Sequence, residues 1–272
     1  MRTQDKHSEI AGDCFLEEWS PGELDYYLDR YAPSKRRRLE RLGLLSLKGR
    51  LVLDGGCGPG TFGVILAETN QVVGIDISGR SVRSANKRAR DARASFVALV
   101  GDLELLPFRS ETFDICFCGW VLHHFPEVEP VIRELKRVLK PEGILAFVEP
   151  NEGSIAMRVS RFFEDRFQKF VLASAIDTPS RNVHSAAYYA AVLRELGFRD
   201  VSFGACYSGE VPALPRSSRE KLGFWTVSAI KLVLGVRHLF FRLSEKLLPQ
   251  PFNGVDLLIT ARKCGESDSA AP

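Results

Sequence analysis

The sequence has no apolar run long enough to cross a membrane. A transmembrane helix needs roughly 20 consecutive apolar residues, whereas the best candidate, residues 222–230, ends at the charged Lys231. The first residues are polar and carry no apolar core of the kind found in a secretory signal peptide. We therefore expect a cytoplasmic protein, for which contact with the inner face of a membrane would be peripheral.

The cysteines form no recognisable motif. There are six of them, and their spacing matches neither a zinc site nor a CxxC redox pair, so no metal site is expected. Cys116 and Cys118 lie two positions apart on a predicted strand and therefore share one face. We interpret the cysteines as buried free thiols in a reducing compartment.

A large excess of charge of one sign is also missing. Lys and Arg number 37 against 34 Asp and Glu, which gives a net charge of +3. Two basic clusters, at 35–41 and 80–93, are interpreted as solvated helix faces, although the first would also suit anionic lipid heads or phosphate. Neither cluster carries the interleaved aromatic residues of a single-stranded nucleic-acid groove, so no nucleic-acid partner is expected.

What the sequence does contain is a regular alternation of strands and helices. Short runs rich in Val and Ile predict strands at 50–54, 71–76, 95–100, 113–118 and 144–148. A glycine-rich loop follows the first strand, and a helix is predicted from this loop to about residue 69. Two more helices are predicted at 78–92 and at 127–139. Right-handed βαβ crossovers of this kind build an α/β, doubly wound parallel sheet that is buried on both faces.

The two ends of the chain are less regular. Residues 1–47 read as an N-terminal helical segment, with one helix from about 23 to 33 and a basic helix at 35–45. Residues 48–150 form the ligand-binding core, and 263–272 a disordered polar tail. The part at 151–262 adds a helix at 185–196 and strands at 198–205 and 255–262. We expect its remaining segments, 153–184 and 206–250, to form a helical cap over the carboxyl edge of the sheet.

The strongest local signal is the sequence DGGCGPG at 54–60, which follows the first predicted strand. Glycines permit backbone angles that other residues resist, and they let a ligand approach the main chain closely. In an open α/β sheet, ligands bind beyond the carboxyl ends of the strands, where this loop lies. The candidate contacts within the loop are Asp54, Gly55, Gly56, Gly58 and Gly60.

The loop also contains a rival pattern, because residues 58–63 spell the dinucleotide fingerprint GxGxxG. The carboxylate of Asp54 at the strand end would repel a pyrophosphate but would suit an ammonium group. Asp76 ends the second strand, where its oxygens can accept from both hydroxyls of a ribose. Asp102 follows the third strand, where it can accept from an adenine amine. These acids favour a ligand with an adenosine and an ammonium group over NAD.

At this point the chain resembles a known family. It carries, in order, DGGCGPG at 54–60, GID at 74–76, GD at 101–102, LPF at 106–108, FD at 113–114, LHHF at 122–125 and RVLKPEG at 137–143. This series is similar to the motifs of the class I, S-adenosylmethionine-dependent methyltransferases of the type 11, ubiquinone/menaquinone-biosynthesis kind. The resemblance covers about residues 48–150. It implies a Rossmann-like seven-stranded sheet in the order 3-2-1-4-5-7-6, with strand 7 antiparallel.

The resemblance also implies roles for individual residues. It implies that Asp54 and Gly56 contact the methionine end of S-adenosylmethionine, that Asp76 contacts the ribose, and that Asp102 and Leu103 contact the adenine. Further expected cofactor contacts are Ile77, Cys118 and Tyr31. Tyr31 lies on the N-terminal helix, which we expect to close over the cofactor, although its tyrosines could equally pack on the core. The product would be S-adenosylhomocysteine. Asp114, at the opposite edge of the sheet, is interpreted as a structural residue.

Candidate catalytic residues follow the fourth strand. A sulfonium methyl is already activated, so the protein mainly has to hold the two reactants in a near-attack geometry. His123 and His124 could accept a proton from a phenol, enol or amine, with His124 favoured. The alternative is that the pair orients the loop and lines the pocket without proton transfer. Predicted contacts with the methyl acceptor are Trp120, Glu149, Asn151 and His184.

The region from 217 to 248 is unusually apolar. We expect it to form a lid over a hydrophobic acceptor, with Phe224, Trp225 and Phe240 lining it, or an interfacial helix that meets the acceptor at a membrane. The alternatives are a packed cap or the surface of a homodimer. The function predicted is O- or C-methylation of a hydrophobic or aromatic small molecule. A catalytically silent S-adenosylmethionine-binding regulator, a nucleic-acid or protein methyltransferase, and an NAD-type oxidoreductase are the other hypotheses.

Overall fold

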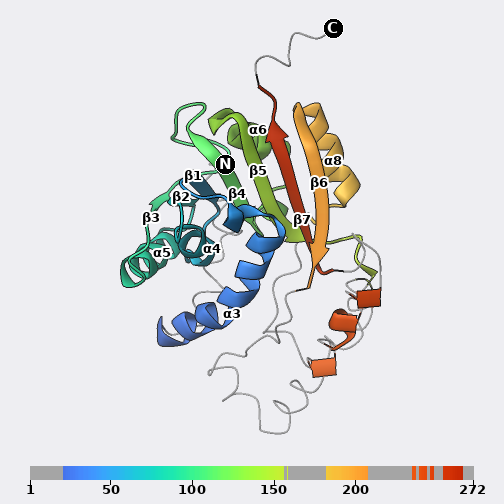
Figure 1. Cartoon of the computed structure of the whole chain (residues 1–272). Coiled ribbons are helices and arrows are strands. Elements are labelled where there is room, and N and C mark those ends of the chain that lie inside the picture. The colour runs from blue at the N-terminus through green and yellow to red at the C-terminus, as the bar shows by residue number, and fades with distance from the viewer. Residues whose placement is uncertain are drawn as a thin grey trace, which may run out of the picture.

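The computed structural model describes residues 21–155, 158, 182–207, 235–236, 239–243, 246–247 and 254–265. Seven strands form a mixed sheet in the order β3-β2-β1-β4-β5-β7-β6 (Figure 1). The pairs among β1 to β5 are all parallel, whereas β7 runs antiparallel to both of its neighbours, β5 and β6. The predicted strand order and the antiparallel last strand are therefore confirmed.

The elements follow the predicted alternation closely. The strands are β1 Leu51–Gly55, β2 Gln71–Asp76, β3 Phe96–Val100, β4 Phe113–Gly119, β5 Leu139–Pro150, β6 Phe198–Cys206 and β7 Asp256–Lys263. The helices are α3 Pro21–Arg41, α4 Thr61–Leu66, α5 Gly79–Asp91, α6 Glu129–Val138 and α8 Ala186–Glu195, with short 3-10 turns η1 Leu44–Ser46 and η2 Leu122–His124.

The sheet is buried on both faces, as β4 shows. Its residues alternate between two cores: Cys116 and Cys118 belong to the core under α6 and α8, and Ile115 and Phe117 to the core under α3, α4 and α5. All four side chains are buried, which explains why the strand reads as a continuous apolar run. Figure 1 shows helices on both sides of the sheet.

The N-terminal helix differs from the prediction. Two helices separated at Pro33 were expected, but α3 runs without a break from Pro21 to Arg41 and contains this proline. A proline inside a helix costs about 3 kcal/mol because it removes one backbone hydrogen bond. The helix is held from outside: Arg38 donates to Asp256, and Arg41 donates to the carbonyl of Ala205 at 2.8 Å. Tertiary contacts thus override the local signal.

The boundary between α6 and β5 was also misplaced. A turn at 140–143 was expected before a strand at 144–148, yet β5 begins at Leu139, directly after α6. Phe113 pairs with Leu139, and the ladder resumes at Ile115 and Ile144 after a shift in register. The bulge absorbs the extra residues in β5, so the predicted turn lies inside an irregular strand.

The carboxyl ends of β1, β2, β4 and β5 meet at one edge of the sheet, together with the start of β7. Asp256 begins β7 and pairs with Pro150, the last residue of β5. Arg41 of α3 reaches the end of β6 at the same edge, on the side where α3 lies in Figure 1. Within the described parts of the chain, none of the helices has the length and apolar character required for a membrane span.

Candidate active site

The glycine loop is shaped by residues in left-handed backbone conformations. Gly56, Gly58 and Gly60 have φ angles of 67°, 51° and 83°. A side chain at Gly60 would collide with Phe96 and Ala85, whereas the space around Gly58 is open. Gly58 is therefore the position at which the main chain is bare and a ligand can lie against it.

The loop is tied to the end of β2. The N–H groups of Gly56 and Cys57 both donate to the carbonyl of Ile75, at 2.8 and 3.0 Å. The N–H of Gly58 donates to Oδ2 of Asp76 at 2.8 Å, and Oδ1 of Asp76 accepts from Ser78 N–H at 2.9 Å. The carboxylate predicted to bind ribose therefore also holds the glycine loop in place.

Asp54 is the buried charge of this site. The residue is 1% exposed, and its Oδ2 has no hydrogen-bond partner within the described ranges of the chain. Burial raises the pKa of Asp54 to about 7, although the positive charge of Lys35 opposes the shift. A buried carboxylate oxygen without a partner needs a donor or a cation. The ammonium group of S-adenosylmethionine is both, so the residues present fit the methionine end of this cofactor.

Lys35 is a site residue that the sequence interpretation did not select. Its Nζ lies 4.8 Å from the ring centroid of Phe62 and 5.7 Å from that of Trp120. The lysine therefore brings a positive charge from α3 to the methionine end, where a carboxylate would be attracted to it. The sequence placed Lys35 in a basic cluster but could not show that this one residue faces the sheet.

The residues predicted for the adenosine lie at the ends of β2 and β3. Ile77 lies just beyond β2 and is 42% exposed. Its apolar side chain is therefore free to cover an adenine ring. Oδ1 of Asp102 accepts from Glu104 N–H at 2.9 Å. Leu103 and Cys118 are buried beneath Gly55, each 3.0 Å from the position of a Cβ there. Their side chains therefore support the loop from below.

Glu149 holds the loop that carries the two histidines. It is 1% exposed, and its carboxylate accepts hydrogen bonds from the N–H groups of Val121, Leu122 and His123. Nδ1 of His123 lies 2.7 Å from Oε2 of the same carboxylate. This set of donors orders η2 and fixes the ring of His123. The geometry favours a positioning role for Glu149 over the predicted contact with the acceptor.

The histidine loop lies directly against the glycine loop. A Cβ at Gly56 would come within 2.4 Å of the side chain of Val121. The rings of His123 and His124 are 4.2 Å apart between centroids. Burial, together with the neighbouring His123, lowers the pKa of His124 to about 4. His124 is therefore neutral at physiological pH and able to accept a proton.

Trp120 is held in a strained conformation beside this loop. Its φ angle is 55°, which is uncommon for a residue with a bulky side chain. Its Nε1 donates to Oδ1 of Asp256 at 2.9 Å, and the guanidinium of Arg38 lies 4.4 Å from its ring centroid. Arg38 also donates to Oδ2 of Asp256 through Nε and Nη2, at 3.0 and 2.6 Å. This buried network joins α3, β7 and the end of β4.

The remaining predicted site residues are distributed around this edge. Asn151 is buried and donates through Nδ2 to the carbonyl of Gly254 at 2.9 Å, so it ties two chain segments together. His184 stacks on Tyr188 at 4.0 Å just before α8. Tyr31 is partly buried on α3, and Phe240 is 40% exposed. Phe224 and Trp225 lie outside the described residues.

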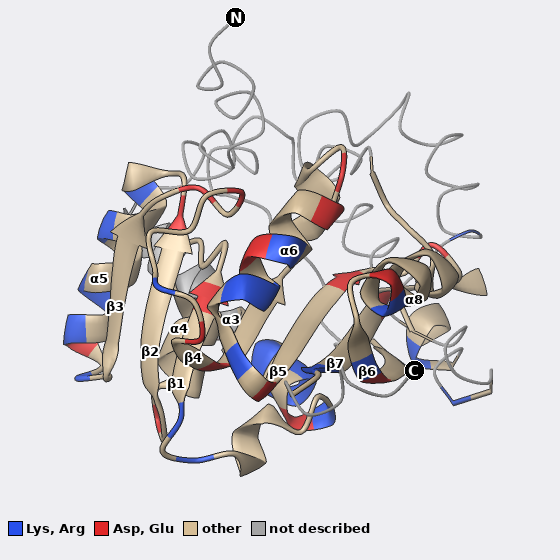
Figure 2. Ribbon diagram, turned by 90° about the horizontal axis from the view of Figure 1, so that it is seen from above, with Lys and Arg blue, Asp and Glu red and all other residues tan. Residues whose placement is uncertain are grey.

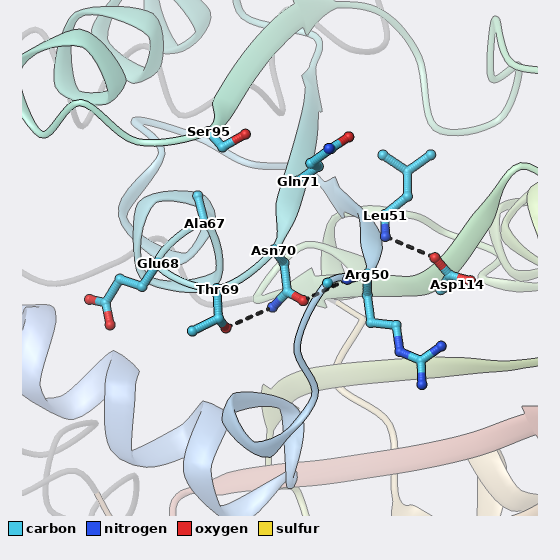
Figure 3. Close-up of a pocket in the computed structure, with 10 residues that line it drawn as sticks. Arg50, Leu51, Ala67, Glu68, Thr69, Asn70, Gln71, Ser95 and Asp114 are labelled. Carbon is cyan, nitrogen blue, oxygen red and sulfur yellow. Dashed lines mark hydrogen bonds between the residues drawn. The ribbon is translucent and has the colours of Figure 1, made fainter.

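A separate pocket of about 500 Å³ lies at the opposite edge of the sheet. Its polar side chains bond to the protein itself: Asn70 accepts from Arg50 N–H and donates to Thr69, and Asp114 accepts from Leu51 N–H at 2.8 Å (Figure 3). Lys140 also pairs with Asp114 at 3.0 Å. The structural role predicted for Asp114 is confirmed, and this pocket is not the predicted site.

The two basic clusters differ in their surroundings. In the first, Arg36 pairs with Glu68, while Arg38 is buried against Asp256. In the second, α5 carries Lys and Arg on its side away from the sheet (Figure 2), where Lys87 pairs with Asp91. The second cluster is therefore mainly an outer helix face, as predicted, but its Arg88 is largely buried and pairs with Asp29 of α3 at 2.7 Å. Part of the first cluster also serves to dock α3.

Comparisons with known proteins agree with the geometry. A family model for a methyltransferase domain matches residues 53–147. A malonyl-(acyl-carrier protein) O-methyltransferase of Legionella pneumophila is 35% identical over 114 residues, which are 41% of this chain and 40% of the relative. A ubiquinone biosynthesis O-methyltransferase of Coxiella burnetii is 30% identical over 143 residues, 52% of this chain and 58% of the relative. The chain thus spans about half the length of these curated relatives.

A solved structure shares the fold. A phosphoethanolamine N-methyltransferase 2 of Haemonchus contortus, in complex with S-adenosyl-L-methionine, has a TM-score of 0.58 at 16% identity, over 85% of this chain and 52% of the other. The series of motifs and the matched family model cover the same stretch of sequence, and the strand order is the one that the motifs imply. Residues 53–147 therefore belong to the class I, S-adenosylmethionine-dependent methyltransferases of type 11.

Proposed function

We propose that the chain methylates a hydrophobic or aromatic small molecule, at an oxygen or carbon atom, with S-adenosylmethionine as the methyl donor. The observation that carries the proposal is the contact between the two loops at Gly56 and Val121. His124 follows Val121 by three residues and is neutral, and Oδ2 of the buried Asp54 has no hydrogen-bond partner among the described residues. These features support a proton acceptor next to a cofactor site.

Each part of the site has a distinct task. When bound, S-adenosylmethionine supplies an electrophilic methyl group. Asp54 and Lys35 would hold the ammonium and carboxylate groups of its methionine, and Asp76 would accept from its ribose hydroxyls. Asp102 and Ile77 would hold the adenine, and Tyr31 on α3 would close over the bound molecule.

His124 takes the proton of the acceptor in this account. An imidazole that stays neutral at physiological pH can accept a proton from a phenol or enol as the nucleophile forms. His123 has a different role, because its Nδ1 is engaged by Glu149. Glu149 would act as the positioning residue that keeps both rings at the carboxyl end of β4.

The hydrophobic acceptor is supported by an exposed apolar row. Val236, Leu239, Phe240, Leu243 and Leu247 follow the pattern i, i+3, i+4, i+7 and i+11, and each is at least 40% exposed. Such spacing places them on one face of a helix, which would cover an apolar acceptor or rest on a membrane surface. A homodimer surface is the competing use. The ubiquinone-biosynthesis relative supports an acceptor of quinone type.

The test is a transfer assay with the full chain and S-adenosylmethionine labelled in the methyl group. Hydroquinones and phenols with long alkyl chains would be compared with small water-soluble amines and carboxylates. The proposal predicts label in the organic extract. Transfer to the water-soluble compounds alone would contradict the hydrophobic acceptor, whereas tight cofactor binding without any transfer would favour a silent binding protein.

A further inference from the structure

An aromatic cluster on α8 contains two buried polar atoms that are not used by the site described above. Tyr189 is fully buried, and its hydroxyl has no hydrogen-bond partner among the described residues. Nε2 of His184, in the same cluster, is also buried and without a partner in the part of the chain that the structure describes. An unpaired buried polar group costs roughly 1–3 kcal/mol. Two such atoms in one cluster therefore call for a ligand that satisfies them.

The cluster lies on the functional edge of the sheet. The ring of Tyr189 packs on Phe147 of β5 at 5.2 Å between centroids, and Phe147 lies two residues before Glu149 on the same face. His184 and Tyr189 have ring centroids 5.9 Å apart. Helical side chains lean toward the helix N-terminus. Because β6 follows α8 and runs parallel to β5, that end of α8 lies at the carboxyl edge of the sheet.

The charges around the cluster determine which kind of ligand it can bind. Burial, and then the negative charge of Glu149, raise the pKa of Tyr189, so its hydroxyl stays protonated and can donate. The pKa of Tyr188 is also raised, mainly by burial and to a smaller extent by the negative charges of Glu127 and Glu129. Carboxylates thus face this region from β5 and from the start of α6. A second anion would be repelled here, whereas the oxygen of a neutral carbonyl would accept from Tyr189 at no such cost.

We propose that Tyr189 and His184 form a subsite that binds a carbonyl oxygen of the methyl acceptor, beside the atom that is methylated. This inference rests on the proposed function, and it narrows the acceptor to phenols or enols that carry a neighbouring ketone, ester or quinone carbonyl. A site built to hydrogen-bond a substrate oxygen discriminates strongly against analogues that lack it, because its own groups are then left unpaired. Tyr189 is thus a specificity-determining residue.

The test compares two ligands that differ only at the carbonyl, ortho-hydroxyoctanophenone and ortho-octylphenol. Their binding to the full chain, saturated with S-adenosylhomocysteine, is measured by calorimetry. We expect the ketone to bind about five- to tenfold more tightly, and Tyr189→Phe to abolish this preference. His184→Phe, which keeps a ring stacked on Tyr188, should reduce the preference as well.

Tyr189→Phe keeps the ring that packs on Phe147, so the variant should fold and bind S-adenosylhomocysteine as the parent does. Its midpoint of thermal unfolding should stay equal or rise, because an unpaired hydroxyl is removed. The subsite would be overturned if the parent bound both ligands equally or bound neither. It would also be overturned if the preference for the ketone persisted in Tyr189→Phe, or if this variant had a lower midpoint of thermal unfolding. A preference that disappears in the variant, without methyl transfer to either ligand, would uphold the subsite and contradict the proposed function.

Discussion

The carboxylate of Asp76 accepts a hydrogen bond from the backbone N–H of Gly58 at 2.8 Å, and this contact joins the end of β2 to the middle of the glycine loop. The same carboxylate is the proposed partner of the cofactor ribose. One side chain would therefore shape the loop and bind the ligand that lies in it.

Asp76→Ala should weaken S-adenosylmethionine binding by roughly 1.5–3 kcal/mol, which is about tenfold or more. The variant loses the proposed bonds to the ribose and the bond that holds Gly58. Calorimetric titration measures the change. Asp91→Ala is the matched control, because Asp91 is exposed and pairs only with Lys87 on the outer face of α5 among the contacts described. Equal affinity of the Asp76 variant and this control would remove Asp76 from the site.

Gly58→Val should abolish cofactor binding while the protein remains folded. The φ angle of 51° strains any residue other than glycine, and a branched side chain would fill the open space above the loop. Gly43→Val is the control, since Gly43 also has a positive φ of 74° and open space around it. Both variants should lose similar stability in thermal unfolding, and only the first should lose binding. Normal binding by Gly58→Val would show that the loop assignment is wrong.

Asp54 should make the stability of the protein depend on pH. Its pKa is about 7 in the folded protein against 3.8 for the ordinary carboxyl, so the folded state holds the proton more tightly. This contribution is fully present below pH 3.8 and is lost as the pH rises through 7. Asp54→Asn removes it, so the variant should become more stable than the parent by on the order of 3–4 kcal/mol as the pH rises across this interval.

Chemical denaturation at a series of pH values would show this difference. A difference in stability between Asp54→Asn and the parent that does not change with pH would mean that folding leaves the pKa of Asp54 unshifted. The Asn variant should also bind S-adenosylmethionine less tightly at pH 7, because it offers no negative charge to the ammonium group.

His124→Gln should lower kcat by about 100-fold or more, the usual contribution of a general base, with little change in cofactor affinity. Because the pKa of His124 is lowered to about 4, the parent enzyme at saturating cofactor should keep a constant kcat from about pH 5.5 to pH 8. A decrease of less than tenfold in the variant would mean that the histidine pair only orients the loop.

The parts of the fold and the site that follow from local patterns were predictable from the sequence. The alternation of apolar runs and helices predicted a doubly wound sheet, and the resemblance carried by the motifs implied its strand order. Asp54, Asp76 and Asp102 were found because each lies at or just after the carboxyl end of a strand. These signals lie within a few residues of the feature that they predict.

Contacts between distant segments could not be predicted in the same way. Arg38 and Asp256 are 218 residues apart, so no spacing in the sequence marks their pairing. The four donors of Glu149 are backbone and side-chain groups of another strand's loop, and the unpaired hydroxyl of Tyr189 is a property of packing alone. Pro33 misled the prediction because the contacts that dock α3, made by Arg38 and Arg41, lie far away in the sequence and offset its local cost.

A single-turnover experiment with the full chain, labelled S-adenosylmethionine and a long-chain hydroquinone tests the proposed methyl transfer directly. We expect label to appear in the hydroquinone. Gly58→Val should abolish this transfer by preventing cofactor binding, and His124→Gln should slow it without changing that binding. If the parent protein binds S-adenosylmethionine and transfers no label to any hydrophobic phenol or enol, the proposed function is contradicted.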